Sequence, residues 1–154
     1  MAPATLAILT LRQYHVRMNV KSHGVDLVSC ARLAESIERH GQRFLDRVFT
    51  EAEQAYCGGK KREIEHYAGR FAAKEAVLKV LGTGWRNGIN WTDIEVRNQP
   101  SGQPKVSLSG RCREIADELG LESIVISISH TDTHAIASAI GLAVSTGGAL
   151  GIGN

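Results

Sequence analysis

The sequence of 154 residues lacks the features that mark secreted and membrane proteins. Its three cysteines, Cys30, Cys57 and Cys112, are widely spaced and odd in number, which excludes a disulfide framework and a CxxC metal site. No apolar run approaches the ~18 residues that a membrane span requires. The apolar stretch from Ala2 to Leu11 contains Pro3 and has no early basic region, unlike a signal peptide. We therefore expect a cytoplasmic protein with reduced thiols.

The sequence also has little of what nucleic-acid-binding and common nucleotide-binding proteins display. Aromatic residues make up 5% of the chain, the formal net charge is +2, and the basic run Lys60-Lys61-Arg62 is short. These features argue against a nucleic-acid surface. The P-loop pattern GxxxxGK[ST] and the Rossmann pattern GxGxxG are both absent. The commonest nucleotide-binding folds are therefore not expected.

The remaining composition, 43% apolar and 22% charged, is typical of one globular domain. Residues 16–28 are rich in β-branched and apolar side chains and predict a strand. Apolar residues then recur at helical spacing, and Gly41 marks a break between two short helices. Thr50 and Glu53 have the spacing of a capping box, which predicts a third short helix that ends near residue 58.

The apolar spacing over residues 63–81 predicts a long amphipathic helix, ended by Gly82-Thr83-Gly84. Residues 91–96 and 105–108 alternate apolar and polar side chains around a turn-forming stretch and predict a hairpin. Ser109 can cap a helix that runs to residue 119.

Two further strands are predicted at residues 123–129 and 134–140, joined by a polar turn. Beyond Gly141 the chain has little apolar bulk and no charge, which indicates a flexible tail. The predicted fold is of the α+β class, with a small antiparallel sheet packed on one long helix and several short helices.

Asp26 is an unusual residue for its position, because it lies between Val25 and Leu27 inside the first predicted strand. A buried carboxylate there would require neutralisation by a cation, and a bound divalent metal is one such cation. An edge strand with this side chain in solvent accommodates the same pattern. The residue alone does not decide between the two interpretations.

The long predicted helix carries two charge pairs at a spacing of four residues. Glu75 precedes Lys79, and Arg70 precedes Lys74, so each pair shares one face of the helix. Most such pairs are exposed and add only ~0.2–0.5 kcal/mol to helix stability. An acid beside several cations is also what a magnesium-bound diphosphate needs, since carboxylates bind the metal while lysine and arginine bind phosphate oxygens.

His130 ends the strand pattern Ser127-Ile128-Ser129 and stands at a turn. A single histidine is usually structural or merely exposed. Its place at a strand end nevertheless favours a function, because sites concentrate where rigid elements meet loops.

Three segments together carry a resemblance to a known family. They are Gly24-Val25-Asp26-Leu27 followed by Arg32, the run GRFAAKEA at 69–76 followed by Lys79, and the run SISHT at 127–131. In this order and spacing they resemble the bacterial holo-acyl-carrier-protein synthases, which are 4'-phosphopantetheinyl transferases. The resemblance covers residues 19–141, which we treat as one catalytic domain. Residues 1–18 are an extension of unassigned role, and residues 142–154 are the expected flexible tail.

The resemblance implies a magnesium-dependent reaction of fatty acid biosynthesis. The 4'-phosphopantetheine group of coenzyme A would pass to a serine of apo acyl carrier protein, with release of adenosine 3',5'-bisphosphate. By the same resemblance, Asp26 and Glu75 would hold the magnesium, and Lys79 would face the diphosphate. The group that removes the serine proton stays open among Glu75, Asp26 and a metal-bound hydroxide.

The resemblance also implies residues for the coenzyme and for the protein partner. Coenzyme contacts would come from Arg70, Lys74, Lys79, Gly82, His130 and Thr131. Acyl carrier proteins are acidic, and a basic face for one is offered by Arg32, Arg39 and Arg43, although interleaved acids are equally typical of a solvated helix surface. Members of the family are typically homotrimers whose neighbouring chains share the sites.

Two other classes of function remain compatible with the same residues. One is a different magnesium-dependent phosphotransferase or hydrolase. The other is a non-catalytic module that binds a carrier protein through the basic surface, although the intact set of Asp26, Glu75 and Lys79 argues against it.

Overall fold

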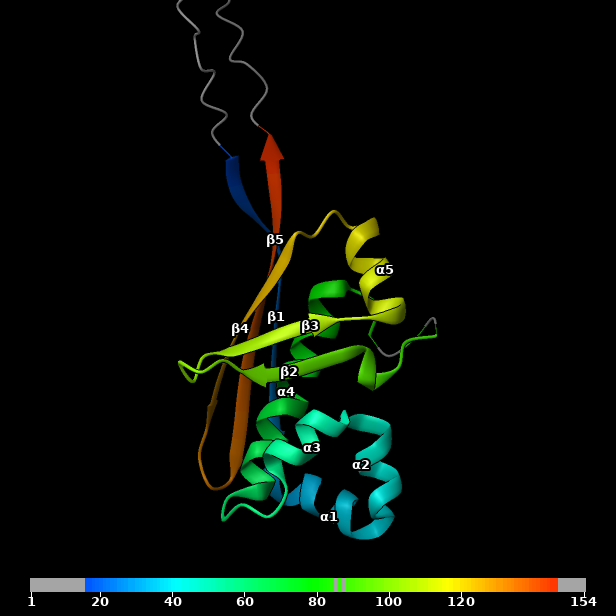
Figure 1. Ribbon diagram of the computed structural model, residues 1–154, viewed down its shortest axis with the longest axis vertical. Coiled ribbons are helices and arrows are strands. Elements are labelled where there is room, and N and C mark those ends of the chain that lie inside the picture. The colour runs from blue at the N-terminus through cyan, green and yellow to red at the C-terminus, as the bar shows by residue number, and fades with distance from the viewer. Residues whose placement is uncertain (1–15, 85, 87, 147–154) are drawn as a thin grey trace, which may run out of the picture.

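The computed structural model describes residues 16–84, 86 and 88–146, which form two antiparallel sheets around one long helix (Figure 1). The first half of the chain contains β1 (Val16–Ser29), α1 (Cys30–His40), α2 (Gln42–Val48), α3 (Glu51–Cys57) and α4 (Glu63–Leu81). The second half contains the 3-10 helix η1 (Trp91–Asp93), β2 (Ile94–Asn98), β3 (Pro104–Leu108), α5 (Gly110–Glu118), β4 (Ser123–His130) and β5 (His134–Thr146). The predicted α+β class is confirmed.

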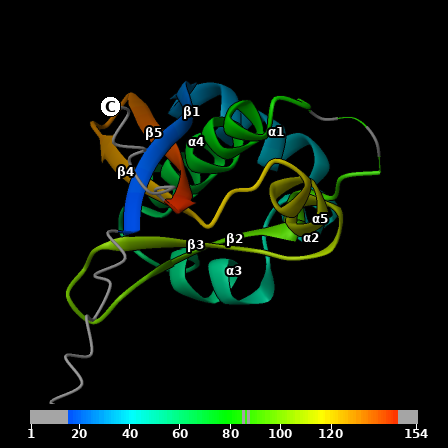
Figure 2. The ribbon, with the colours of Figure 1, turned by 90° about the horizontal axis from the view of Figure 1, so that it is seen from above.

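The larger sheet has the strand order β1-β5-β4, with both pairings antiparallel, while β2 and β3 form a separate hairpin. Helix α4 contacts all three strands of the larger sheet on one side and β2 on the other (Figure 2). Along β5, the buried side chains are alternate alanines, Ala135, Ala137 and Ala139. Because alanine has a single methyl group, this central strand allows a helix to lie close to the sheet.

The closest approach between sheet and helix occurs at Gly24 in β1. A Cβ atom built at this residue would lie 2.1 Å from the carbonyl oxygen of Ala76 and 2.8 Å from the Cβ of Lys79. No side chain fits in that space, so glycine is required here by the packing of β1 on α4. Two residues further on, Asp26 is thereby brought beside the same helix.

Helix α4 is buried on almost every side from Tyr67 to Leu81. The described residues contain no candidate membrane-spanning helix. Within residues 67–81 the accessible side chains are those of Phe71, Glu75 and Lys79, which recur every four residues and form one stripe. The prediction of an amphipathic helix was therefore wrong in kind, although its limits were right. Arg70 and Lys74, the charged pair that shares one face of this helix, are buried.

An ion pair inside the core joins α3, α4 and β2. Nζ of Lys74 lies 2.8 Å from Oε2 of Glu53, and neither side chain has exposed surface. The same ammonium group donates to the carbonyl oxygens of Trp91 at 3.0 Å and Ile94 at 2.5 Å. Oε1 of Glu53 accepts from the backbone N–H of Val96 at 2.8 Å. All three ammonium hydrogens thus have acceptors, which offsets the cost of burying the charge.

Most predicted element limits agree with the structure. The break at Gly41 separates α1 from α2, and the capping box of Thr50 and Glu53 starts α3. Gly82 ends α4 in the left-handed conformation. Ser109 does precede α5, but its side chain makes no capping hydrogen bond and instead donates to the carbonyl oxygen of Asp93 at 3.4 Å.

Two predicted elements were wrong in extent. Residues 91–93 form a turn of 3-10 helix rather than the start of a strand, closed by mutual hydrogen bonds between Asn90 and Asp93. Residues 142–146, assigned to a flexible tail, continue β5 and pair with β1, so that Leu142 lies opposite Val20. The composition of this stretch did not indicate a strand. Its pairing with β1 could not be read locally, because β1 lies far away in the sequence. The rest of the predicted tail, 147–154, lies outside the described residues.

We predict that Lys74→Met destabilises the protein by ~3–5 kcal/mol, because the substitution leaves the buried Glu53 carboxylate without its cation. Urea denaturation followed by circular dichroism measures the change. The exposed Lys105→Met is the matched control and should change stability by less than ~0.5 kcal/mol. A loss of less than ~1 kcal/mol in Lys74→Met would contradict the role of this ion pair.

Candidate active site

Three charged side chains predicted from two separate motifs meet where β1 packs on α4. Nζ of Lys79 lies 2.9 Å from Oδ1 of Asp26 and donates to the carbonyl oxygen of Val25 at 2.6 Å. Glu75 lies one helical turn before Lys79 on the accessible stripe, and it interacts electrostatically with both charges. The structure therefore brings together Asp26, Glu75 and Lys79, as the motifs predicted.

The electrostatics of this group leave negative charge incompletely balanced. Burial raises the pKa of the Glu75 carboxyl, the neighbouring Asp26 raises it further, and Lys79 lowers it only in part. Among the described residues, no side chain donates a hydrogen bond to the Glu75 carboxylate. Two carboxylates in close proximity are thus left with one ammonium group between them, an arrangement that an additional positive charge would stabilise.

The donor set is compatible with magnesium. Magnesium is usually bound by one or two carboxylates, keeps several waters and completes its coordination with substrate phosphates. Among the described residues there is no group of three or more histidine, cysteine or acidic side chains that could form a complete protein cage. Asp26 and Glu75 present two carboxylates at the accessible surface, and the ammonium group of Lys79 already binds one of them.

Lys74 does not join this group. It lies on a different face of α4, fully buried, with its ammonium group bound to Glu53 and to two backbone carbonyls. Burial lowers the pKa of Lys74, while the Glu53 carboxylate raises it. No exposed atom of this lysine is left to contact a ligand, so the expectation that Lys74 binds coenzyme A disagrees with the structure. The physical reason is that an i,i+4 charge spacing marks a shared face and not an exposed one.

Arg70 and His130 line a separate hollow of about 180 Å3 at the start of α4 and the end of β4. Arg70 is 4% exposed, and its guanidinium carbon lies 4.0 Å from the centroid of the Tyr56 ring. The guanidinium group donates to Oδ1 of Asn98 at 2.9 Å. Its buried Nε has no hydrogen-bond partner among the described residues. The hollow thus presents an incompletely satisfied cation, as an anionic ligand requires.

Two residues of this hollow were missed by sequence reasoning. Oε2 of Glu65 lies 3.0 Å from Nδ1 of His130, and the His66 ring packs edge-on against His130, with 6.1 Å between centroids. Burial lowers the pKa of His66, and the nearby charges of Lys60 and Arg70 lower it further. Glu65 and His66 belong to no motif named above and meet His130 only through the fold, so the sequence contains no signal for this contact.

The two remaining coenzyme candidates lie at chain turns. The Thr131 hydroxyl accepts from the backbone N–H groups of Thr133 at 3.3 Å and His134 at 3.2 Å, and so shapes the turn between β4 and β5. Gly82 has a φ of 70° at the end of α4, a conformation that favours glycine. Their predicted contacts with coenzyme A stay predictions.

The predicted basic face is exposed on the two helices that follow β1. Arg32 stands in the first turn of α1, four residues before Ser36. An open hollow of about 480 Å3 between α1 and α2 is lined by Ser36, Arg39, His40, Arg43, Phe44 and Arg47. The structure therefore gathers the arginines spaced four apart on one concave surface.

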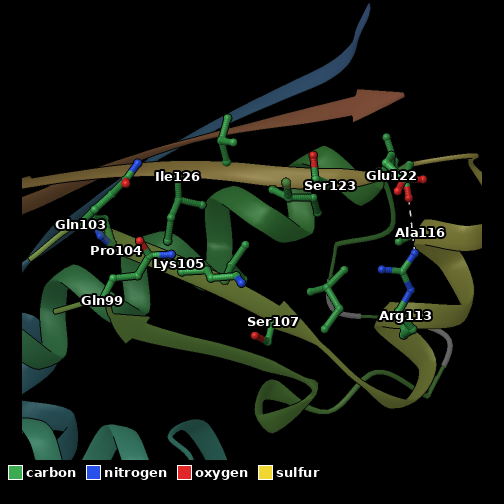
Figure 3. A pocket seen from close by; sticks show the side chains of 15 residues that line it. Gln99, Gln103, Pro104, Lys105, Ser107, Arg113, Ala116, Glu122, Ser123 and Ile126 are labelled. Carbon is green, nitrogen blue, oxygen red and sulfur yellow. Dashed lines mark hydrogen bonds between the residues drawn. The ribbon is translucent and has the colours of Figure 1, made fainter. Parts of the chain in front are cut away.

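Figure 3 shows a further hollow of about 460 Å3 between β3, β4 and α5. Lys105 and Arg113 stand on its walls, and Arg113 is already paired with Asp117 and donates to the carbonyl oxygen of Leu121 at 3.3 Å. None of the predicted site residues lines this hollow. This hollow is therefore separate from the candidate site.

Known proteins are similar to this chain in sequence and in fold. The profile of the 4'-phosphopantetheinyl transferase superfamily matches residues 22–138. A holo-[acyl-carrier-protein] synthase of Koribacter versatilis is 45% identical over 117 residues, which cover 76% of this chain and 94% of that relative. The chain belongs to the 4'-phosphopantetheinyl transferase superfamily. Within it, the similarity is to the holo-acyl-carrier-protein synthases, which confirms the resemblance found in the motifs.

Solved structures of the same group extend this similarity to the fold. The Helicobacter pylori holo-[acyl-carrier-protein] synthase in complex with coenzyme A is 34% identical, with a TM-score of 0.66 and coverage of 80% of this chain and 99% of that one. The Bacillus anthracis synthase in complex with CoA (3',5'-ADP) is 32% identical, with a TM-score of 0.68 and coverage of 82% and 99%.

We predict that Glu75→Gln stabilises the metal-free protein at pH 7 by ~0.5–2 kcal/mol, although it removes a site residue. The folded-state pKa of Glu75 lies above its ordinary value of 4.5, so ionisation of this carboxyl opposes folding once the pH exceeds that value. The difference between variant and wild type should shrink as the pH falls and wild-type Glu75 becomes protonated. Urea unfolding in EDTA at several pH values tests this, and a variant less stable than wild type at pH 7 would refute it.

Proposed function

We propose that this protein is a magnesium-dependent enzyme that transfers the 4'-phosphopantetheine group of coenzyme A to a serine of apo acyl carrier protein. The products are holo acyl carrier protein and adenosine 3',5'-bisphosphate. The observation that carries the proposal is the meeting of Asp26, Glu75 and Lys79 at one accessible place, in a chain of this superfamily. The names of the similar proteins state the same activity.

The charged groups act mainly through position and charge. Asp26 and Glu75 would hold the magnesium, which would neutralise the coenzyme diphosphate and stabilise negative charge on the leaving group. Lys79 is on the same accessible stripe of α4 as Glu75 and stabilises the departing adenosine 3',5'-bisphosphate. The carrier serine attacks the β-phosphorus directly, while the bond from that phosphorus to the bridging oxygen of the leaving adenosine 3',5'-bisphosphate breaks. The serine proton passes to one of the bases named above, so no covalent intermediate on the enzyme is required.

The second hollow supports a role in holding the coenzyme. Arg70 contributes a buried guanidinium with one unpartnered nitrogen, and His130 contributes an imidazole oriented by Glu65. Both features suit negatively charged phosphate oxygens. Thr131 and Gly82 complete the set of proposed contacts, whereas Lys74 is left out because it is buried in an ion pair.

The basic hollow between α1 and α2 supports binding of an acidic protein. Its arginines Arg39 and Arg43 are exposed, and α1 begins directly after β1, the strand that carries Asp26. An acidic carrier protein docked on these helices would therefore have its serine close to the site. Complementary charge of this kind mainly accelerates association and selects the partner. Arg32, at the start of α1, is the residue of this face nearest in sequence to the site.

The outer face of the larger sheet supports a homotrimer. The face opposite α4 exposes large apolar side chains, among them Val20 at 67%, Leu27 at 64% and Val125 at 48%. The other members of this apolar face are Met18, Val25, Ile136 and Val144. Contiguous apolar surface on a sheet usually marks a protein interface. We propose that further copies of this chain cover it.

Sites shared between neighbouring copies would explain why the metal group and the coenzyme hollow lie apart within one chain. Asp26 lies on β1 and His130 on β4, the two edge strands of the sheet, with β5 between them. A trimer would allow the metal group of one copy to face the coenzyme hollow of the next. The three cysteines are free and buried, as suits a reducing compartment, and we therefore place the reaction in the cytoplasm. We assign the reaction to fatty acid biosynthesis.

The transfer is tested by intact-mass spectrometry of apo acyl carrier protein incubated with the enzyme, coenzyme A and magnesium. We predict a gain of one phosphopantetheine group, lost when the metal is removed with EDTA. Asp26→Ala and Glu75→Ala should each reduce the rate by at least ~100-fold, because each removes a proposed metal ligand. Glu118→Ala, which removes an exposed acid of α5, is the control and should retain the rate.

The outcome also separates the competing functions. No mass gain with several apo carrier proteins, despite a folded and oligomeric sample, would refute the transferase and favour a non-catalytic carrier-binding module. Release of nucleotide from coenzyme A or ATP without modification of the carrier would favour a different phosphotransferase or hydrolase.

The oligomer is tested separately by sedimentation velocity. We predict that Leu27→Glu dissociates the homotrimer to monomers and reduces transfer at least ~10-fold, because a charge is placed in the proposed apolar interface. Leu119→Glu, at an exposed leucine after α5, is the matched control and should leave the trimer intact. A Leu27→Glu protein that sediments like wild type would contradict this assignment of the interface.

A further inference from the structure

Lys79 is bound to β1 in a way that its proposed role toward the diphosphate does not explain. Its ammonium group donates to Oδ1 of Asp26 at 2.9 Å and to the carbonyl oxygen of Val25 at 2.6 Å. It also affects the ionisation of Glu75. Within the chain, Lys79 thus supplies the positive charge that the two carboxylates require.

The two partners of this ion pair differ in their freedom to move. The Asp26 side chain is 20% exposed and belongs to a strand paired with β5, whereas the Lys79 side chain is 51% exposed on a flexible four-carbon stem. The lysine can therefore turn into solvent while the aspartate stays in place. A divalent cation on Asp26 and an ammonium group at hydrogen-bond distance from the same oxygen would repel each other.

We propose that Lys79 competes with the divalent cation for Asp26, and that cation binding displaces the ammonium group toward the coenzyme diphosphate. The inference rests on the proposed function for the identity of the metal ligands. It assigns Lys79 two successive positions, one as counter-ion of Asp26 in the cation-free protein and one as a contact of the leaving group. Because the Lys79 ammonium group must first leave Asp26, the two carboxylates bind the cation more weakly than they would without this lysine.

The backbone around the site keeps the displaced lysine near. The Val25 carbonyl is fixed in the β1–β5 ladder and lies beside Asp26, so it remains an acceptor when Asp26 is taken by the cation. Gly24 makes this position reachable, because a Cβ built there would lie 2.8 Å from the Cβ of Lys79.

Manganese binding to the full chain without coenzyme A tests the proposal, with free Mn2+ measured by its paramagnetic resonance signal at low ionic strength. Lys79→Met keeps a chain of similar length and removes the charge. We expect the Mn2+ dissociation constant of this variant to fall about fivefold, the equivalent of one exposed ion pair, while its transfer rate falls. Lys105→Met removes the same charge from β3, far from the site, and should bind Mn2+ like wild type.

A second background shows whether the effect passes through Asp26. Asp26→Asn should weaken Mn2+ binding, and adding Lys79→Met to it should give no further gain, because the contested carboxylate is gone. Equal or weaker Mn2+ binding by Lys79→Met than by wild type would overturn the proposal. So would an equal gain in the Asp26→Asn background, or no Mn2+ binding by any of these proteins. The carrier assay with coenzyme A reports separately on the proposed transfer.

Discussion

The architecture depends on how closely α4 can lie against β1 and β5. Gly24 leaves no side chain between strand and helix, and the alternate alanines of β5 add only methyl groups beneath the same helix. Small residues bury little apolar surface each, so this contact is optimised for distance rather than for hydrophobic gain. The result is that Asp26 on the strand and Lys79 on the helix meet at 2.9 Å. A helix one methyl group further away would not complete the site.

On the opposite side of α4, buried charged side chains fix the helix to its neighbours. Lys74 pairs with Glu53 and two carbonyls, and Arg70 binds Asn98 of the hairpin. With small residues on one side and buried cations on the other, the helix is constrained on two faces by different forces. The accessible stripe of Phe71, Glu75 and Lys79 is what remains, and two of its three members are proposed to act in the chemistry.

Local signals predicted nearly all the elements, because periodicity, caps and glycines act over a few residues. The capping box at Thr50 and the termination at Gly82 are examples. Long-range pairs were not predictable in the same way. Glu53 was recognised as a cap, but its bond to Lys74 depends on the docking of α3 on α4, and the contact of Glu65 with His130 depends on the whole sheet. The motif resemblance named Asp26 and Glu75, which the structure brings together with Lys79. It also named Lys74, which is buried, because charge spacing does not report burial.

The pairing of β1 with β5 also sets the order in which the molecule can mature during synthesis. Asp26 lies opposite Ala137, more than a hundred residues later, so β1 has no partner strand until almost all of the described chain has been made. The helices α1 to α4 are local and can form while translation continues. The strand that carries Asp26 is therefore paired into the sheet only after β5 has been made.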